Sequence, residues 1–178
     1  TAAFARSVAL YERLARDSML PIARVLGADT SYQTVPVAYV VYSYVEGVEW
    51  ASLYPHLRAR EREAAFRDLG AAVAGVHRFT FPTFGSTDGT AGTTTYLPAW
   101  YARLSAQLSP ADLAYFLRVL QPYKSLFTKV DRARLCHDDL HHHNILFHQE
   151  RGRWRVAALL DFDKAWAGDV ESDLARLE

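Results

Sequence analysis

The stretch HDDLHHHN, residues 137–144, brings four imidazole side chains and three carboxylate or amide side chains into eight positions. Such a stretch can serve two different tasks. Its histidines could hold a transition metal, because imidazole is a common ligand of zinc. Alternatively, Asp139 and Asn144 could form a catalytic loop that works with a hard metal ion such as Mg²⁺. The residues on either side of the stretch help to distinguish these interpretations.

The residues that follow predict a β-hairpin. NILFH begins at Asn144 and is typical of a short strand, QERGR supplies a turn around Gly152, and WRVAALLDF is typical of a second strand that ends at Asp161. Because a hairpin brings its two ends together, Asn144 and Asp161 should meet at one edge, with Asp139 nearby. Amide and carboxylate oxygens suit Mg²⁺, and a separate carboxylate could accept a proton from a hydroxyl group. Phosphoryl transfer requires this combination of metal, base and positioning.

Apolar periodicity predicts four helices earlier in the chain, at residues 3–16, 58–78, 97–108 and 110–120. Residues 36–45 are rich in Val and Tyr and predict a buried strand. Residues 81–96 predict a Gly- and Thr-rich loop, which lacks the strand, helix and lysine of a phosphate loop. Ser109 is expected to cap the last helix. Four residues of that helix are expected to face a core: Leu113, Phe116, Leu117 and Leu120.

Composition and charge limit the classes of protein that need to be considered. Half of the 178 residues are hydrophobic, which is enough for a core. Lys and Arg number 20, as do Asp and Glu, so the zero net charge gives no sign of binding to nucleic acid or to an anionic membrane. One cysteine and no long apolar run indicate neither a disulfide scaffold nor a membrane span, and a cytoplasmic protein is expected.

The order of these motifs resembles the aminoglycoside phosphotransferase and choline kinase-like small-molecule kinases. HDDLHHHN and the later LLDFD resemble the H-G-D-x-x-x-x-N and D-F motifs of that family. FARSVALYERLARDSMLPIARVL is similar to its αC helix, VAYVVYSYVEG to its hinge strand, and LGAAVAGVHRF to the long helix of its C-lobe. The resemblance implies an α+β, protein-kinase-like fold. In that fold, a mostly helical C-lobe with a β-hairpin carries the catalytic and metal residues, beside a remnant of the N-lobe.

The resemblance also implies a role for particular residues. Asp139 matches the catalytic base, Asn144 and Asp161 match the Mg²⁺ ligands, and Asp173 matches an Asp that supports the catalytic loop. Three positions match residues around the nucleotide: Tyr42, Ser43 and Val45. We therefore expect ATP- and Mg²⁺-dependent transfer of the γ-phosphate to a hydroxyl of a small molecule. Aminoglycoside-like antibiotics, choline and sugars all stay open as acceptors, and the sequence carries no signal of an oligomeric state.

The chain also departs from the family pattern. The Gly-rich loop and its following lysine are not in the sequence, nor are the helices that end the family's chains, so we expect truncation at both ends. On this view residues 1–45 are the N-lobe remnant and residues 46–178 are the C-lobe. Ser7 stands where the family often has a Glu that pairs with the lysine, and Asp138 replaces the usual glycine beside the base.

Three further interpretations stay open. His141–His143 could form a zinc site of a metal-dependent hydrolase, although consecutive histidines cannot all point at one ion. The missing lysine and Ser7 would also fit a nucleotide-binding pseudokinase or regulatory module. Asp163 could be a second metal ligand or simply a solvated carboxylate, and Cys136 is expected to be a buried, inert thiol.

Overall fold

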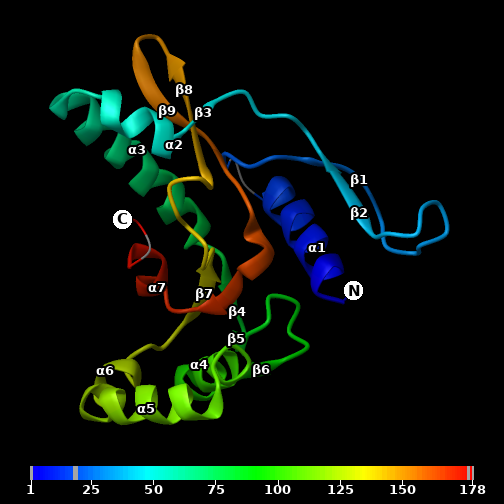
Figure 1. Cartoon of the computed structure of the whole chain (residues 1–178), viewed down its shortest axis with the longest axis vertical. Coiled ribbons are helices and arrows are strands. Elements are labelled where there is room, and N and C mark those ends of the chain that lie inside the picture. Colours follow the sequence, from blue (N-terminus) through cyan, green and yellow to red (C-terminus); the bar gives the residue numbers. More distant parts are fainter. Residues whose placement is uncertain (1, 18–19, 176, 178) are drawn as a thin grey trace.

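The structure is a computed structural model that describes residues 2–17, 20–175 and 177, and it has an α+β fold (Figure 1). The helices are α1 Ala2–Asp17, α2 Trp50–Leu53, α3 Ala59–Val76, α4 Tyr96–Ser105, α5 Pro110–Leu120, α6 Lys124–Phe127 and α7 Glu171–Leu174. The strands are β1 Val25–Asp29, β2 Tyr39–Tyr42, β3 Val48–Glu49, β4 Thr80–Phe81, β5 Phe84–Gly85, β6 Gly92–Thr93, β7 Ala133–Cys136, β8 Ile145–Glu150, β9 Arg153–Leu159 and β10 Trp166–Gly168. The four predicted helices are confirmed as α1, α3, α4 and α5.

The predicted hairpin is confirmed as β8 and β9. Its turn consists of Arg151 and Gly152, whose φ angles of 49° and 77° are those of the tight turn that matches the twist of paired strands. β3 adds a third strand, antiparallel to β8. At the other end of the hairpin, Ile145 pairs with Leu159, so that the residues following and preceding the strands are brought together as predicted.

The main core lies between this hairpin and helix α3, which packs against β9. One face of α3 is apolar at helical spacing and is buried, with Leu69 at 1% exposure and Ala65 at 0%. Trp50 from α2 closes the side of the core, and its ring lies 4.8 Å from the ring of Phe147 in β8. The hairpin is therefore well packed against helix α3.

A second sheet passes beneath the hairpin, with strand order β4-β7-β10-β5-β6. Three of these strands are short and fall in residues 80–93. The prediction of a loop over residues 81–96 was thus wrong in part, because short strand pairings with β7 and β10 give this Gly- and Thr-rich segment a defined path. The sheet is important for the site because β7 leads directly into the loop at residues 137–144.

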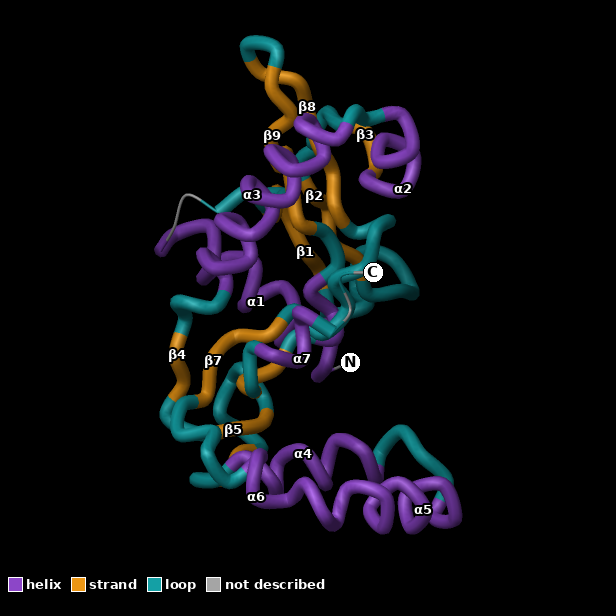
Figure 2. Tube along the Cα trace, turned by 90° about the vertical axis from the view of Figure 1, so that its left-hand side faces the viewer, coloured by secondary structure: helices purple, strands orange, loops and turns teal. Residues whose placement is uncertain are grey.

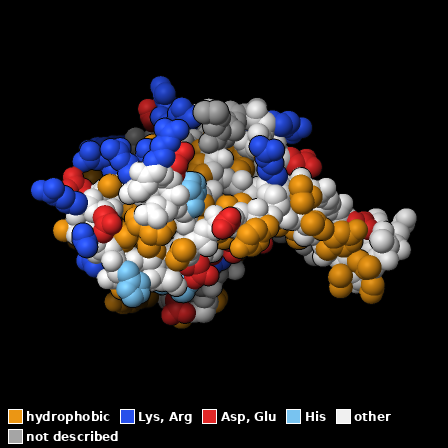
Figure 3. Space-filling view, turned by 90° about the horizontal axis from the view of Figure 1, so that it is seen from above, with side chains coloured by type: hydrophobic (Ala, Val, Ile, Leu, Met, Phe, Trp, Pro, Cys, Tyr) orange, Lys and Arg blue, Asp and Glu red, His pale blue; other side chains and the backbone are white. Residues whose placement is uncertain are grey.

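The strand predicted at residues 36–45 is shorter and more exposed than expected. It forms β2, which pairs only with β1 in a two-stranded ribbon that projects beside α1 (Figure 1). Figure 3 shows hydrophobic side chains along this projecting part, and Val37, Val41 and Tyr44 are 58%, 48% and 89% exposed. The prediction of a buried strand was wrong because a two-stranded ribbon has only one face to place against the rest of the chain.

Helices α4, α5 and α6 form an arm that extends away from the hairpin (Figure 2). We call these three helices the helical arm. The cap of α5 is confirmed, since Ser109 Oγ accepts a hydrogen bond from the backbone N–H of Asp112. The expectation that α5 faces a core was wrong: its apolar face is the less exposed one, but no residue of α5 is buried. Among the described helices, none is long and apolar enough to cross a membrane.

Candidate active site

The loop between β7 and β8 is fixed by a buried carboxylate, and we refer to residues 137–144 as the catalytic loop. Asp173, in α7, is 0% exposed and accepts hydrogen bonds from the backbone N–H groups of His137 and Asp138, at 2.9 and 2.8 Å. The oxygen that accepts from His137, Oδ2, also contacts His77 Nε2 at 2.9 Å. Burial alone would raise the pKa of Asp173, but these hydrogen bonds outweigh it and lower the pKa. The expected support of the loop by Asp173 is therefore confirmed.

His137 joins the catalytic loop to the end of the hairpin. Its Nδ1 accepts a hydrogen bond from the backbone N–H of Asp139, so its Nε2 carries the proton and donates to the carbonyl of Leu160 at 2.8 Å. Burial lowers the pKa of His137, because the charged imidazolium would lose its hydration. A neutral His137 thus holds the loop beside the residue that precedes Asp161.

The carboxylate of Asp139 lies at the centre of the site. Its side chain is 11% exposed, and Lys164 Nζ lies 2.9 Å from its Oδ1. His141 Nε2 lies 4.0 Å from its other oxygen. Such a carboxylate is ionisable, partly accessible and held at a fixed place, which are the properties that a general base needs.

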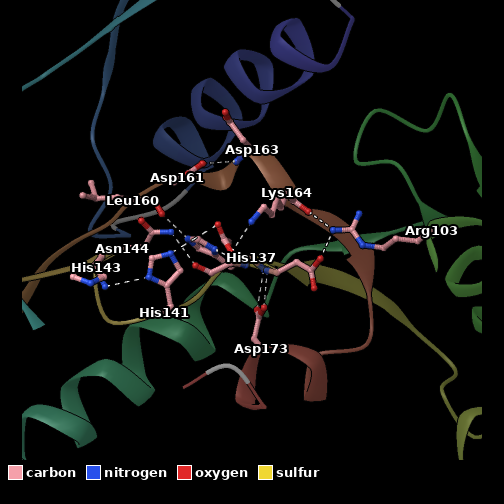
Figure 4. A network of polar contacts seen from close by, with 12 residues as sticks. Arg103, His137, His141, His143, Asn144, Leu160, Asp161, Asp163, Lys164 and Asp173 are labelled. Carbon is pink, nitrogen blue, oxygen red and sulfur yellow. Dashed lines mark hydrogen bonds and ion pairs between the residues drawn. The ribbon is translucent and has the colours of Figure 1, made fainter. Parts of the chain in front are cut away.

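Asn144 and Asp161 are brought to the same edge, as the hairpin predicts. The backbone N–H of Leu160 donates to the Asn144 carbonyl at 2.9 Å, and the Asn144 side-chain amide donates to the carbonyl of Asp139 at 2.9 Å. Figure 4 shows Asn144 and Asp161 together with Lys164 around the catalytic loop. The side chain of Asp161 is exposed, and its backbone has a φ of 63°, which the hydroxyl of Tyr11 supports by accepting from its N–H group.

Helix α1 reaches the site through two hydroxyl groups. Ser7 Oγ donates to the carboxylate of Asp163 at 2.6 Å, and the Tyr11 hydroxyl accepts from the backbone at Asp161. Burial raises the pKa of Tyr11 to about 12, so that this hydroxyl stays protonated. Asp163 is thus hydrogen-bonded and exposed, which agrees with the simpler of its two interpretations.

Next to Asp161 there is a cavity of about 490 Å³ between α1, β2 and the hairpin. The three residues expected to surround a nucleotide all line it: Tyr42, Ser43 and Val45. The Tyr42 ring packs against Tyr11 at 4.8 Å between centroids. The N–H group of Ser43, however, donates to the carbonyl of Arg24 at 2.8 Å, so this group is already bound within the chain. Asp161 lines the same cavity, which places the expected metal ligand at its edge.

A second cavity, of about 640 Å³, lies on the other side of the segment that contains Asp163 and Lys164. It is bounded by α1, the β5–β6 turn and α4, and Phe84 and Trp166 give it apolar walls. Asp163 lines both cavities, so the segment Phe162–Lys164 separates them.

The three consecutive histidines lie with their ring centres within 6.0 Å of one another but make different polar contacts. His143 Nδ1 contacts Glu49 at 2.8 Å, while His141 Nε2 faces Asp139. Within residues 2–17, 20–175 and 177, no three His, Cys, Asp or Glu side chains are grouped so that they could hold a metal ion. Cys136 is buried as expected, and burial raises the pKa of its thiol.

Two cationic residues of the site were missed by sequence reasoning. Lys164 follows Asp161 by three positions, a spacing that could have placed it beside the loop. Arg103 had no such signal, because it lies 35 residues before Asp138, whose carboxylate it contacts.

The donor set fits a hard metal ion with nucleotide phosphates. The amide of Asn144 and the carboxylate of Asp161 would provide oxygen ligands, and the nearby cavity has the size and apolar lining of a small-molecule site. A separate carboxylate, Asp139, remains to accept a proton. The α+β fold and this arrangement of residues are those expected of a protein-kinase-like lobe.

The chain belongs to the family described as "Phosphotransferase enzyme family", whose sequence model matches residues 1–177. No curated protein sequence gives a match. Three solved structures share the fold. The first is a protein of Ralstonia eutropha JMP134 that is described as an aminoglycoside phosphotransferase, with 20% identity and a TM-score of 0.67. The second is APH(3'')-Id of Streptomyces rimosus ATCC10970, with 21% identity and a TM-score of 0.66. The third is APH(4)-Ia, with 17% identity and a TM-score of 0.66.

These alignments cover 95%, 99% and 97% of this chain, but only 52%, 65% and 59% of the respective solved chains. The present chain thus spans between half and two thirds of the structures it resembles. The Streptomyces rimosus enzyme has been crystallised with ADP and streptomycin, and a thermostable mutant of APH(4)-Ia with ADP and hygromycin B.

Proposed function

We propose that this chain carries the catalytic site of an ATP-dependent phosphotransferase that moves the γ-phosphate of ATP to a hydroxyl of a small molecule. The observation that carries the proposal is the convergence of Asp139, Asn144 and Asp161 at one end of the hairpin, beside a cavity of about 490 Å³. On this proposal, residues 1–45 are the N-lobe part of the site and residues 46–178 the C-lobe, in a cytoplasmic enzyme.

Each residue has a distinct task in this proposal. The nucleotide lies in the cavity with Tyr42, Ser43 and Val45, and the adenine meets the backbone at Val45, because the Ser43 N–H is bound to Arg24. Asn144 and Asp161 would hold Mg²⁺, which would neutralise charge on the phosphates.

Asp139 orients the acceptor hydroxyl and takes its proton. Lys164, 2.9 Å from Asp139, holds this carboxylate in place. The named ligands of the structural neighbours make aminoglycosides the first acceptors to try, with choline and sugars next.

The test compares Asp139→Asn with the unchanged protein, using the full chain that its gene encodes. Calorimetric titration with MgATP should give the same affinity within about twofold, whereas transfer to streptomycin, hygromycin B, choline or glucose should fall by roughly 10²–10⁴-fold. Asp161→Ala should lose the Mg²⁺-dependent part of the affinity. Asp131→Asn, at an exposed position, is the control.

Unchanged turnover in Asp139→Asn would remove this residue from the mechanism. Tight MgATP binding without turnover on any acceptor would favour the regulatory module over the enzyme.

A further inference from the structure

We propose that Arg103 is a positioning residue that couples helix α4 to the catalytic base, and this inference rests on the function proposed above. Arg103 lies in the last turn of α4, the first helix of the helical arm. Its guanidinium donates hydrogen bonds to the carboxylate of Asp138 and to the backbone carbonyl of Lys164, the latter at 2.8 Å. One side chain thus reaches both segments that surround Asp139 (Figure 4).

The first connection runs through Asp138, which precedes the base in the chain. Asp138 has a φ of 58°, a conformation that L-residues rarely adopt and that glycine adopts freely. Its N–H group is held by Asp173 at 2.8 Å, and its carboxylate by Arg103. Asp138 is therefore held through both its backbone and its side chain. This sets the direction of the backbone at the next residue, Asp139.

The second connection runs through Lys164. Arg103 binds the carbonyl of Lys164, and the ammonium group of Lys164 lies 2.9 Å from the carboxylate of Asp139. If Arg103 were removed, the backbone at Lys164 would lose this hydrogen bond, and the ammonium group would be free to leave the base. Both connections end at the same carboxylate.

Arg103 is itself held in place, which a positioning residue requires. Its guanidinium carbon lies 5.0 Å from the centre of the Trp166 ring, within the range of a cation–π contact, and its side chain is only 24% exposed. Arg103 also lines the 640 Å³ cavity, together with Ala99 and Ala102 of the same helix. A molecule in that cavity would therefore touch the group that fixes the catalytic loop.

The inference is tested by steady-state hydrolysis of MgATP, with water as the acceptor, in the full chain that the gene encodes. Arg103→Met should lower kcat by about 10- to 100-fold and leave the KM for MgATP unchanged, because a small displacement of the base affects the chemical step and not nucleotide binding. Arg118→Met, which removes an exposed arginine of α5 without contact to the loop, should leave both constants unchanged.

A double-mutant cycle shows whether Arg103 acts through Asp138. In the Arg103→Met background, Asp138→Gly should cause no further loss of kcat, because the contact through which Arg103 acts on Asp138 is already absent. Arg103→Lys should recover part of kcat, since an ammonium group can still bind Asp138.

A kcat of Arg103→Met equal to that of Arg118→Met overturns the inference, and so do effects that multiply in the double variant. If Arg103→Met does not fold, as judged by circular dichroism, Arg103→Lys and Asp138→Asn give the same cycle. An unchanged protein that neither hydrolyses MgATP nor transfers phosphate to any of the acceptors named above overturns the proposed function itself. An active protein with an unaffected Arg103→Met variant overturns the positioning role alone.

Discussion

The catalytic loop and the helical arm meet at Arg103, yet different interactions hold them. Residues 137–140 of the loop are all buried, and its backbone is tied by hydrogen bonds to Asp173. In the arm, no residue of α5 or α6 is buried. The loop is held by a few strong, directional contacts, and the arm by many weak ones.

The contacts of the arm are mainly between aromatic rings. Trp100 of α4 lies 5.8 Å from Phe116 and 5.1 Å from Phe127, measured between ring centres. Such contacts are individually weak and stabilise less when they are half exposed to water. The difference teaches that the base is fixed from the main core, and that Arg103 is the contact through which the arm reaches the loop.

The largest effect is expected for Asp173→Ala. The substitution leaves two buried backbone N–H groups and His77 without their acceptor, so the free energy of unfolding should fall by about 3–5 kcal/mol. Urea denaturation measures this loss, with Asp131→Ala as an exposed control. A loss below about 1 kcal/mol would mean that the loop does not depend on Asp173 and would remove the contrast with the arm.

A matched pair of leucine substitutions compares the core with the arm directly. Leu69→Ala in α3 removes a side chain that is 1% exposed and should cost about 3 kcal/mol. Leu117→Ala removes a half-buried side chain of α5 and should cost less than about 1 kcal/mol. Both values come from the same denaturation experiment, and equal losses would show that the arm is as well packed as the core.

Sequence reasoning predicted the parts of the molecule that depend on local pattern. The hairpin followed from a turn at Gly152 between two apolar segments, and its geometry brought Asn144 to the residues before Asp161. The cap at Ser109 also followed from the residue type alone. These features depend on neighbours within a few residues, which the sequence displays.

The parts that failed depend on what packs against them from far along the chain. Helix α5 has the apolar periodicity of a core helix, but periodicity shows which face is apolar and not whether another element covers it. For the same reason β2 was expected to be buried. Arg103 was missed because its partner Asp138 is 35 residues away, and no pattern in the sequence connects them.

The change of stability with pH should arise from groups at the catalytic loop and not from the helical arm. Burial holds the pKa of His137 below its ordinary value of 6.5. Below pH 6.5, the unfolded chain therefore takes up a proton more readily than the folded chain does. The stability contributed by a neutral His137 is present above pH 6.5 and declines as the pH falls below that value. Asp173, whose pKa is lowered from 3.8, adds a further loss when the pH falls through its folded value.

Thermal unfolding between about pH 7.5 and about pH 5.5 measures the first of these effects. The decrease in Tm should be smaller in His137→Asn, which cannot take up the proton, and unchanged in His148→Gln, at an exposed position. An identical decrease in His137→Asn would show that another group is responsible.

A small and local effect is expected at the cap of α5, and it tests whether the arm unfolds separately. Ser109→Ala removes the acceptor of the Asp112 N–H and should destabilise the helix by about 1 kcal/mol. If the arm opens on its own, hydrogen exchange should become about fivefold faster in α5 and stay the same in α3, because only the local opening is affected. Ser105→Ala, whose hydroxyl only bonds a carbonyl within its own helix, is the control. Equal acceleration in α3 would mean that arm and core open together, and the loop would then depend on the arm for more than the contacts of Arg103.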